Sequence, residues 1–203
     1  PGIIPYARGN GSVYGEILNS AKYIGRSCHL MAKNFDTGPI ILQQKFKVSK
    51  ELILSKAVHI INRNLDEFIY NSIIKVIKIK KIKKLKKKFG RYFPRFIEGD
   101  EFIDWTQKSN FIYKKINARL YEKYSVAIIK KNLNKVLVSK VSLAKNVSPY
   151  FSVPGQIIDK QNNGILVKTG DTAIWINKIF DNKKKIHITP KLNIDSNFLI
   201  LNI

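Results

Sequence analysis

A short turn, Asp36-Thr37-Gly38-Pro39, carries the first residues in this 203-residue sequence that could do chemistry. The turn joins two segments with strand-like composition, so the sequence predicts that the Asp36 carboxylate lies on a loop between strands. A carboxylate there is a candidate catalytic group. The alternative is an ordinary turn carboxylate that accepts a hydrogen bond from its own downstream backbone.

A basic segment is the second candidate, because lysines crowd residues 78–88 and arginines then alternate with aromatic residues in 91–96. Cations that meet phosphates and rings that stack on bases are the usual means of contacting single-stranded nucleic acid. The alternative is a solvated helix C-terminus, where cations suit the partial negative charge. We expect an RNA-binding segment that includes Lys83, Lys84, Lys86, Lys87, Arg91 and Arg95.

The overall charge favours an anionic partner, since 37 Lys and Arg against 14 Asp and Glu give a formal net charge of +23. Such an excess is typical of proteins that bind nucleic acid or an anionic surface. Most of the cations are Lys, however, and Ile and Asn are also abundant. A/T-rich codons would produce this composition without selection for charge, so the local basic segment carries more weight than the total.

Other side chains indicate little chemistry. Cys28 is the single cysteine, so it cannot form an internal disulfide or a multi-thiolate metal site. His29 is interpreted as a structural histidine on a buried strand, and His59 and His187 show no metal-ligand spacing. We therefore expect no metal and a cytoplasmic location. The richest apolar run, residues 52–61, is interrupted by polar residues and is too short to span a membrane.

The hydrophobic patterns predict two structured parts. In the first, a loop over residues 1–11 precedes a helix at 12–18 and strands at 28–31 and 40–48; one long helix then starts at Ser49 and ends at Gly90. After an aperiodic segment, Ser109 begins a helix, and turn residues separate strands in the rest of the chain. The expected strands lie at 126–129, 136–141, 156–158, 165–168, 173–179, 186–188 and 198–201. So many short strands predict a small barrel.

Several motifs, in this order and spacing, resemble the methionyl-tRNA formyltransferase family. They are IIPYARGNGSVYGEILNS, GRSCHLMAKNFDTGPIILQQ, YFPRFIEGDEFIDW, VPGQIID and GILVKTGD. The resemblance implies an α/β fold, in which the C-terminal part of a Rossmann-like formyltransferase domain is followed by a small OB-like β-barrel. The implied domains are a partial catalytic domain (1–88), a linker (89–108) and a C-terminal barrel-like domain (109–203).

The resemblance also implies roles for individual residues. Pro5, Arg8 and Gly9 match the family's substrate loop, and Asp36 matches its catalytic carboxylate. Thr37 and Gly38 complete the Asp-Thr-Gly turn and are expected to bind the formyl donor, 10-formyltetrahydrofolate. The family's catalytic Asn and His have no match here and would precede Pro1, so we expect an incomplete chain that is inactive by itself.

Three functions follow as alternatives. The first is transfer of a formyl group to the amino group of methionyl-tRNA, which serves translation initiation. The second keeps the reaction but uses a nucleotide-linked amino sugar as the acceptor. The third is a non-enzymatic relic that binds RNA through charge. In each case we expect a monomer.

Overall fold

The computed structural model describes residues 1–49, 52–78, 90–95, 97–119, 125–128, 134–147, 152–194 and 197–198. The chain divides into two compact units, Pro1–Ile97 and Glu98–Ile203. The division falls within the segment where the sequence predicts a linker. Both units combine helices with sheets, as an α/β fold requires.

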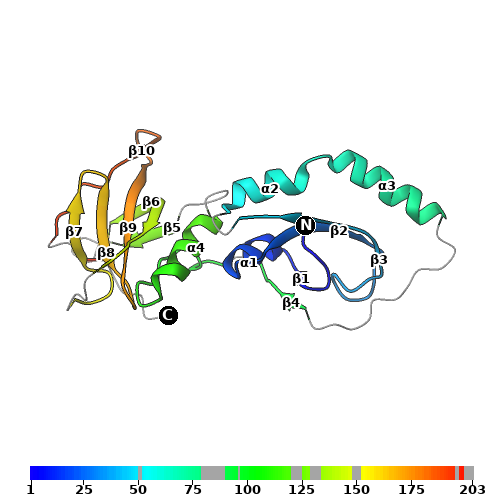
Figure 1. Cartoon of the computed structure of the whole chain (residues 1–203), viewed down its shortest axis with the longest axis horizontal. Helices are drawn as coiled ribbons and strands as arrows, with labels where there is room; N and C mark the ends of the chain where they lie inside the picture. The colour runs from blue at the N-terminus through cyan, green and yellow to red at the C-terminus, as the bar shows by residue number, and fades with distance from the viewer. Residues whose placement is uncertain are drawn as a thin grey trace. The chain divides into compact units, whose positions relative to one another are not determined.

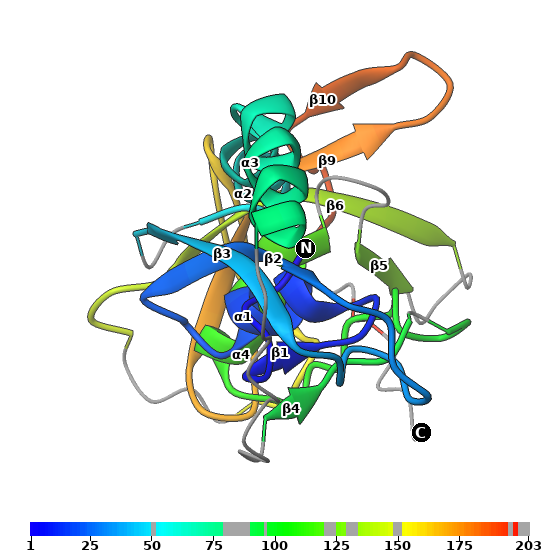
Figure 2. The ribbon, with the colours of Figure 1, turned by 90° about the vertical axis from the view of Figure 1, so that its right-hand side faces the viewer.

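The first unit is built on an antiparallel hairpin of β2 (Tyr23–His29) and β3 (Ile40–Lys47) (Figure 1). Helix α3 (Leu65–Lys78) lies along this hairpin, as Figures 1 and 2 both show. A second, two-stranded parallel sheet pairs β1 (Ala7–Arg8) with β4 (Arg91–Tyr92). Residues more than eighty positions apart in the chain are therefore neighbours, and this pairing borders the predicted substrate loop. The other described helices of the unit are α1 (Ser12–Leu18) and α2 (Leu54–Asn62).

The long helix predicted from Ser49 is wrong in its continuity, because the chain breaks between α2 and α3. Arg63 is extended, at φ −62° and ψ 129°, and Asn64 has φ 50°, a left-handed conformation that Asn tolerates well. Arg26 of β2, only 4% exposed, stabilises the break. Its guanidinium donates to the carbonyl oxygens of Ile61 at 2.6 Å and Asn64 at 3.0 Å. The first of these bonds supplies a partner that a carbonyl in the last turn of α2 needs. The predicted continuation from 79 to 89 lies outside the described residues.

The second unit is a sheet with the strand order β5-β6-β9-β8-β7, in which all neighbours are antiparallel and β10 pairs with β9. Its strands are β5 (Ser125–Ile128), β6 (Lys135–Leu143), β7 (Ile157–Gln161), β8 (Gly164–Lys168), β9 (Ala173–Asp181) and β10 (Ile186–Ile188). Helix α4 (Ser109–Arg119) packs mainly on β6. Buried Trp105 stacks on Phe198, with ring centroids 5.2 Å apart, in the core between helix and sheet.

A closed barrel is not found in the described part of the second unit. The pairing runs from β5 to β7 and stops there. Of the last strand expected from the sequence, only Phe198 is described, and the neighbouring Asn197 forms an isolated bridge with Gln156. Among the described helices, none has the length and apolarity needed to span a bilayer.

Candidate active site

Asp36 lies on the loop between β2 and β3 and contacts two other segments of the first unit. Its Oδ2 accepts a hydrogen bond from the backbone N–H of Gly9 at 2.6 Å. Its Oδ1 lies 3.6 Å from Nε2 of His29, at the end of β2. Both side chains are partly exposed, His29 at 23% and Asp36 at 30%, so a substrate can reach them.

The hydrogen bond made by Nδ1 of His29 determines which ring nitrogen can exchange a proton with Asp36. Nδ1 lies 2.8 Å from the carbonyl oxygen of Leu30, and because a carbonyl can only accept, Nδ1 carries a hydrogen. Nε2 is then the nitrogen that can gain or lose a proton, and it faces the Asp36 carboxylate. The two side chains together can hold one proton at an accessible position, as acid–base catalysis requires.

Gly9 reaches Asp36 through an unusual backbone conformation, with φ +88°. A side chain here would also place its Cβ 2.3 Å from the carbonyl oxygen of Phe93. Glycine is required on both counts. Of the three residues predicted for the substrate loop, Gly9 is thus in direct contact with the candidate carboxylate.

Pro5 and Arg8 face the segment that begins at Gly90 instead. Pro5 follows a cis peptide bond, and its carbonyl oxygen would lie 1.4 Å from a Cβ at Gly90. Arg8 donates from Nη2 to the Gly90 carbonyl oxygen at 3.3 Å. These contacts shape the loop, and a contact of Pro5 or Arg8 with substrate stays a prediction.

Thr37 and Gly38 hold the shape of the loop that carries Asp36. The Thr37 hydroxyl donates to the Asn34 carbonyl oxygen at 2.8 Å. A Cβ at Gly38 would lie 1.7 Å from the Leu30 carbonyl oxygen, so the loop can close only over glycine. Binding of the formyl donor by these two residues stays a prediction.

Of the predicted RNA-binding residues, Arg91 and Arg95 lie in the described part of the chain, and both are exposed. Arg91, in β4, also donates to the Asn19 side chain. Lys83, Lys84, Lys86 and Lys87 lie outside the described residues. Their role in RNA binding stays a prediction.

His29 is the site residue that sequence reasoning missed. It was interpreted as structural, although the structure places it opposite Asp36. The predicted strand at 28–31 makes His29 an internal strand residue, whereas in the structure β2 ends at His29. Within the described ranges, no three His, Cys, Asp or Glu side chains gather as a metal site would need.

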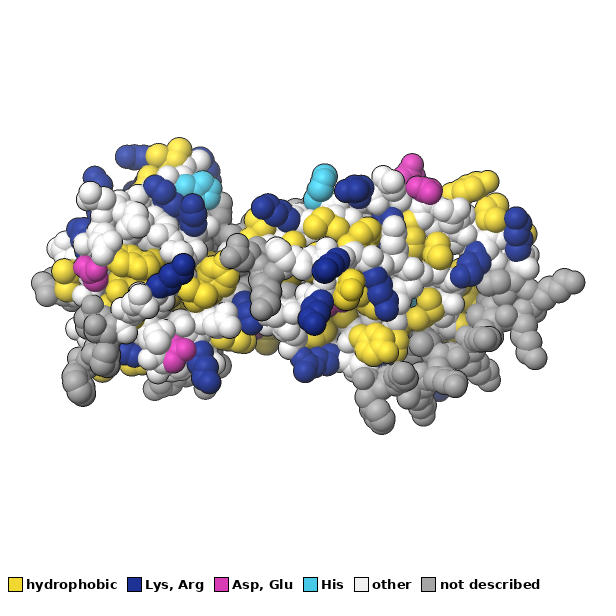
Figure 3. Space-filling model, viewed as in Figure 1, with side chains coloured by type: hydrophobic (Ala, Val, Ile, Leu, Met, Phe, Trp, Pro, Cys, Tyr) yellow, Lys and Arg dark blue, Asp and Glu magenta, His cyan; other side chains and the backbone are white. Residues whose placement is uncertain are grey.

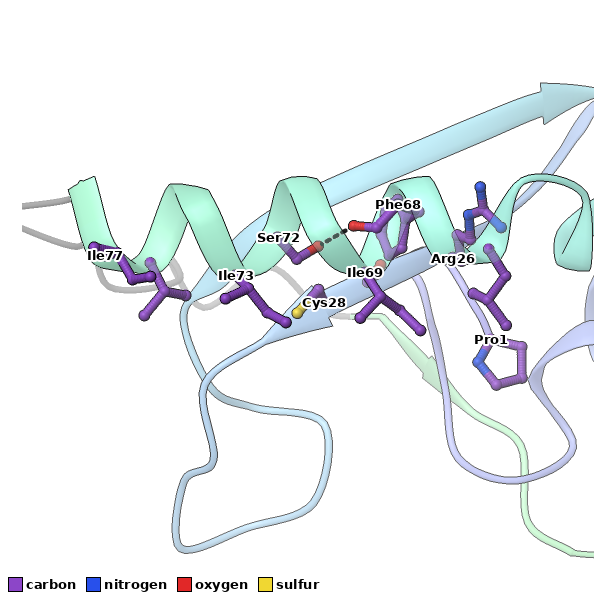
Figure 4. Close-up of a pocket in the computed structure, with 11 residues that line it drawn as sticks. Pro1, Arg26, Cys28, Phe68, Ile69, Ser72, Ile73 and Ile77 are labelled. Carbon is purple, nitrogen blue, oxygen red and sulfur yellow. Dashed lines mark hydrogen bonds between the residues drawn. The ribbon is translucent and has the colours of Figure 1, made fainter.

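An apolar groove of about 430 Å³ runs along α3 (Figure 4). Cys28, which precedes His29, lies at one wall, and Phe68, Ile69 and Ile73 of α3 lie at the other.

Comparisons with known proteins identify the family to which this chain is similar. Residues 97–195 match the family model described as formyl transferase, C-terminal domain. A methionyl-tRNA formyltransferase from Prochlorococcus marinus (strain MIT 9515) is 30% identical over 197 residues, covering 86% of this chain and 57% of that protein. A GDP-perosamine N-formyltransferase from Brucella melitensis is 42% identical over 50 residues, covering 25% of this chain and 19% of that protein.

A solved structure shares the fold. HypX from Aquifex aeolicus in complex with tetrahydrofolic acid superposes with a TM-score of 0.61 at 14% identity, covering 90% of this chain and 32% of that chain. The chain spans 57% and 64% of the lengths of two methionyl-tRNA formyltransferases that it matches. From the domain match and these relatives, this chain belongs to the formyltransferase family.

Proposed function

We propose that this chain takes part in transferring a formyl group from a folate-type donor to an amine, with Asp36 as the catalytic carboxylate. The observation that carries the proposal is the contact of Asp36 with His29 and with the Gly9 amide. The donor supplies the formyl group, and 10-formyltetrahydrofolate is the form expected. A relative of known structure binds tetrahydrofolic acid, which supports a donor of this class.

The chemistry of the pair suits the reaction. An amine nitrogen must lose a proton when it attacks the formyl carbon, and the departing nitrogen of the donor must gain one. Asp36 and His29 can hold that proton between Oδ1 and Nε2. Ordered N–H donors are also needed where negative charge develops on oxygen, and the family pattern assigns that task to an Asn that no residue of this chain matches.

Methionyl-tRNA is the acceptor we favour, and a nucleotide-linked amino sugar is the second candidate. The match to a methionyl-tRNA formyltransferase extends over 197 residues, whereas the match to the GDP-perosamine enzyme covers 50. The exposed Arg91 and Arg95 add cations that could meet an RNA backbone. From the sequence we expect a cytoplasmic location, a monomer and an OB-like barrel, and a tRNA-modifying role is consistent with all three. These three expectations, and the Rossmann-like assignment of the first unit, remain predictions.

The test is formyl transfer by the intact protein, meaning this chain joined to a segment that supplies the Asn and His of the family pattern. Methionyl-tRNA and a nucleotide-linked amino sugar are offered separately. Asp36→Asn should lower turnover by about 10²–10⁴-fold and leave the circular dichroism spectrum unchanged. Asp181→Asn, at the last residue of β9, removes a charge from the other unit and should have no effect. If Asp36→Asn retains full turnover, the carboxylate is not catalytic. RNA binding without any formyl transfer would favour the relic instead.

A further inference from the structure

Residues 90–94 form a strap over the loop that carries Gly9. The Arg91 amide donates to the Tyr6 carbonyl oxygen at 3.0 Å, and the Phe93 amide donates to that of Arg8 at 2.8 Å. In return, the Gly11 amide donates to the Phe93 carbonyl oxygen at 3.1 Å. These hydrogen bonds hold the loop on both sides of Gly9, whose own amide is directed to Asp36 at 2.6 Å.

The Phe93 side chain fixes the strap to helix α1. A Cβ added at Gly15 of α1 would lie 2.0 Å from Cδ1 of the Phe93 ring, so the ring rests directly on the helix backbone. The strap also approaches Gly11 closely, where an added Cβ would lie 2.4 Å from the Pro94 carbonyl oxygen. Glycines at positions 9, 11 and 15 therefore share one cause, which is the close approach of the strap.

We propose that Phe93 is a positioning residue for Asp36. Its ring anchors the strap on α1, its backbone holds the Gly9 loop, and the Gly9 amide fixes one carboxylate oxygen while the other faces His29. The catalytic meaning of this inference rests on the role proposed for Asp36. The mechanical link from Phe93 to the carboxylate can be tested without it.

The direct test follows the Gly9 amide in the full chain by NMR. In the native chain, a short hydrogen bond to a carboxylate should shift this amide proton downfield and protect it from solvent exchange. In Phe93→Ala, the shift should move towards the random-coil value and exchange should accelerate by at least about ten-fold. Amides of β2 and β3 serve as the internal reference and should keep their protection. Phe111→Ala, at a 42% exposed phenylalanine of α4, is the matched control.

A second variant covers the case in which Phe93→Ala fails to fold. Gly15→Ala keeps Phe93 and replaces glycine with a better helix former, so propensity alone predicts a neutral or stabilising change. The strap predicts the opposite, because the new methyl group overlaps the ring. Exchange of the Gly9 amide should accelerate in Gly15→Ala. The double variant, Gly15→Ala with Phe93→Ala, should exchange no faster than Phe93→Ala alone, because the ring that the new methyl group would overlap is gone.

The outcomes separate the two proposals. Unchanged Gly9 exchange in both single variants, or equal acceleration at Gly9 and throughout β2 and β3, would overturn the positioning role. Full turnover of Asp36→Asn would overturn the catalytic role and leave the exchange result standing.

Discussion

At the scale of single residues, Glu16 couples folding to pH. This carboxyl on α1 is 6% exposed, and its Oε2 has no hydrogen-bond partner among the described residues. Burial raises the pKa of Glu16 from 4.5 to about 7, against the opposing effect of a backbone hydrogen bond at Ile3. Because folding raises this pKa, Glu16 contributes stability below about pH 4.5 that is lost as the pH rises through about 7.

Glu16→Gln should therefore change the pH profile of stability. The variant should gain at least about 2 °C in melting temperature over the native chain at pH 8, and this advantage should shrink towards pH 5. Thermal unfolding followed by circular dichroism across that range is the measurement. Glu67→Gln, at an exposed glutamate of α3, is the control. If the difference in melting temperature between Glu16→Gln and the native chain is the same at every pH, the Glu16 carboxyl does not titrate as described.

His29 should matter for turnover because its Nε2 faces Asp36. In the intact protein, His29→Ala should lower formyl transfer by at least about ten-fold, less than Asp36→Asn, since the carboxylate remains. His59→Ala, at an exposed histidine of α2, should leave turnover unchanged. Equal rates of formyl transfer in His29→Ala and His59→Ala would show that His29 has only a structural role.

The contrast between Asp36 and His29 shows what a sequence can reveal about a site. The Asp-Thr-Gly turn is local, so it can be found without knowing the fold. The position of His29 depends on the pairing of β2 with β3, which has an irregular register between Cys28 and His29. Such an irregularity re-aims a side chain, and simple strand alternation could not predict that His29 faces the loop.

At the scale of elements, the start of α4 depends on a carboxylate that is distant in sequence. Asp171 accepts hydrogen bonds from the amides of Ser109 and Thr172, both at 2.8 Å. Burial opposes ionisation of Asp171, but these backbone hydrogen bonds outweigh it and lower its pKa from 3.8 to about 2. Because folding lowers this pKa, the stability that Asp171 contributes is present above pH 3.8 and is lost as the pH falls towards 2.

Asp171→Asn should accordingly lower the denaturant midpoint of the second unit at pH 7, since the first amide of α4 loses a charged partner. The deficit should narrow between about pH 4 and 2. Urea unfolding followed by Trp fluorescence measures this, because Trp105 and Trp175 both lie in that unit. Asp159→Asn, whose carboxylate accepts hydrogen bonds from its neighbours Lys160 and Gln161, should show no such pH dependence. A deficit that stays constant down to pH 2 would contradict the assigned role.

The elements themselves could be predicted unevenly. The helix at Ser12–Leu18 and the strand at Ile186–Ile188 have the expected bounds, because turn residues flank both. The break after Asn62 could not be predicted, since it is stabilised by Arg26 from a strand 35 residues earlier. Helical periodicity continues across Arg63 and Asn64, and only the tertiary contact shows where the helix stops.

At the scale of the whole molecule, charge is the property that reaches across both units. Figure 3 shows Lys and Arg side chains spread over this face of each unit, interspersed with apolar ones and with few acidic groups. The total of +23 could be predicted to attract any polyanion. The net charge alone does not show whether the cations serve RNA binding or result from A/T-rich codons. The discriminating experiment must therefore use the local basic segment.

Salt dependence of tRNA binding makes that distinction. If Arg91 of the strap and the adjacent Arg95 meet the RNA backbone, the logarithm of the binding constant should fall linearly with the logarithm of salt concentration, by about 0.7–0.9 per neutralised phosphate. Arg91→Gln with Arg95→Gln should reduce the slope by about 1 to 2 units. The pair should weaken binding of methionyl-tRNA and of unrelated RNA alike, because phosphate contacts carry no sequence information.

The control pair, Lys56→Gln with Lys75→Gln, removes the same net charge from α2 and α3. If it reduces the slope as much as the arginine pair, the attraction is due to net charge alone and the strap is not an RNA contact. An amino-sugar acceptor predicts a third result, because a nucleotide-linked sugar carries only two phosphates. Its affinity should then be almost unchanged by either pair, and formyl transfer to it should persist in both. Filter binding at several salt concentrations, run beside the two transfer assays, separates these results, because each acceptor predicts its own response to the same two arginines.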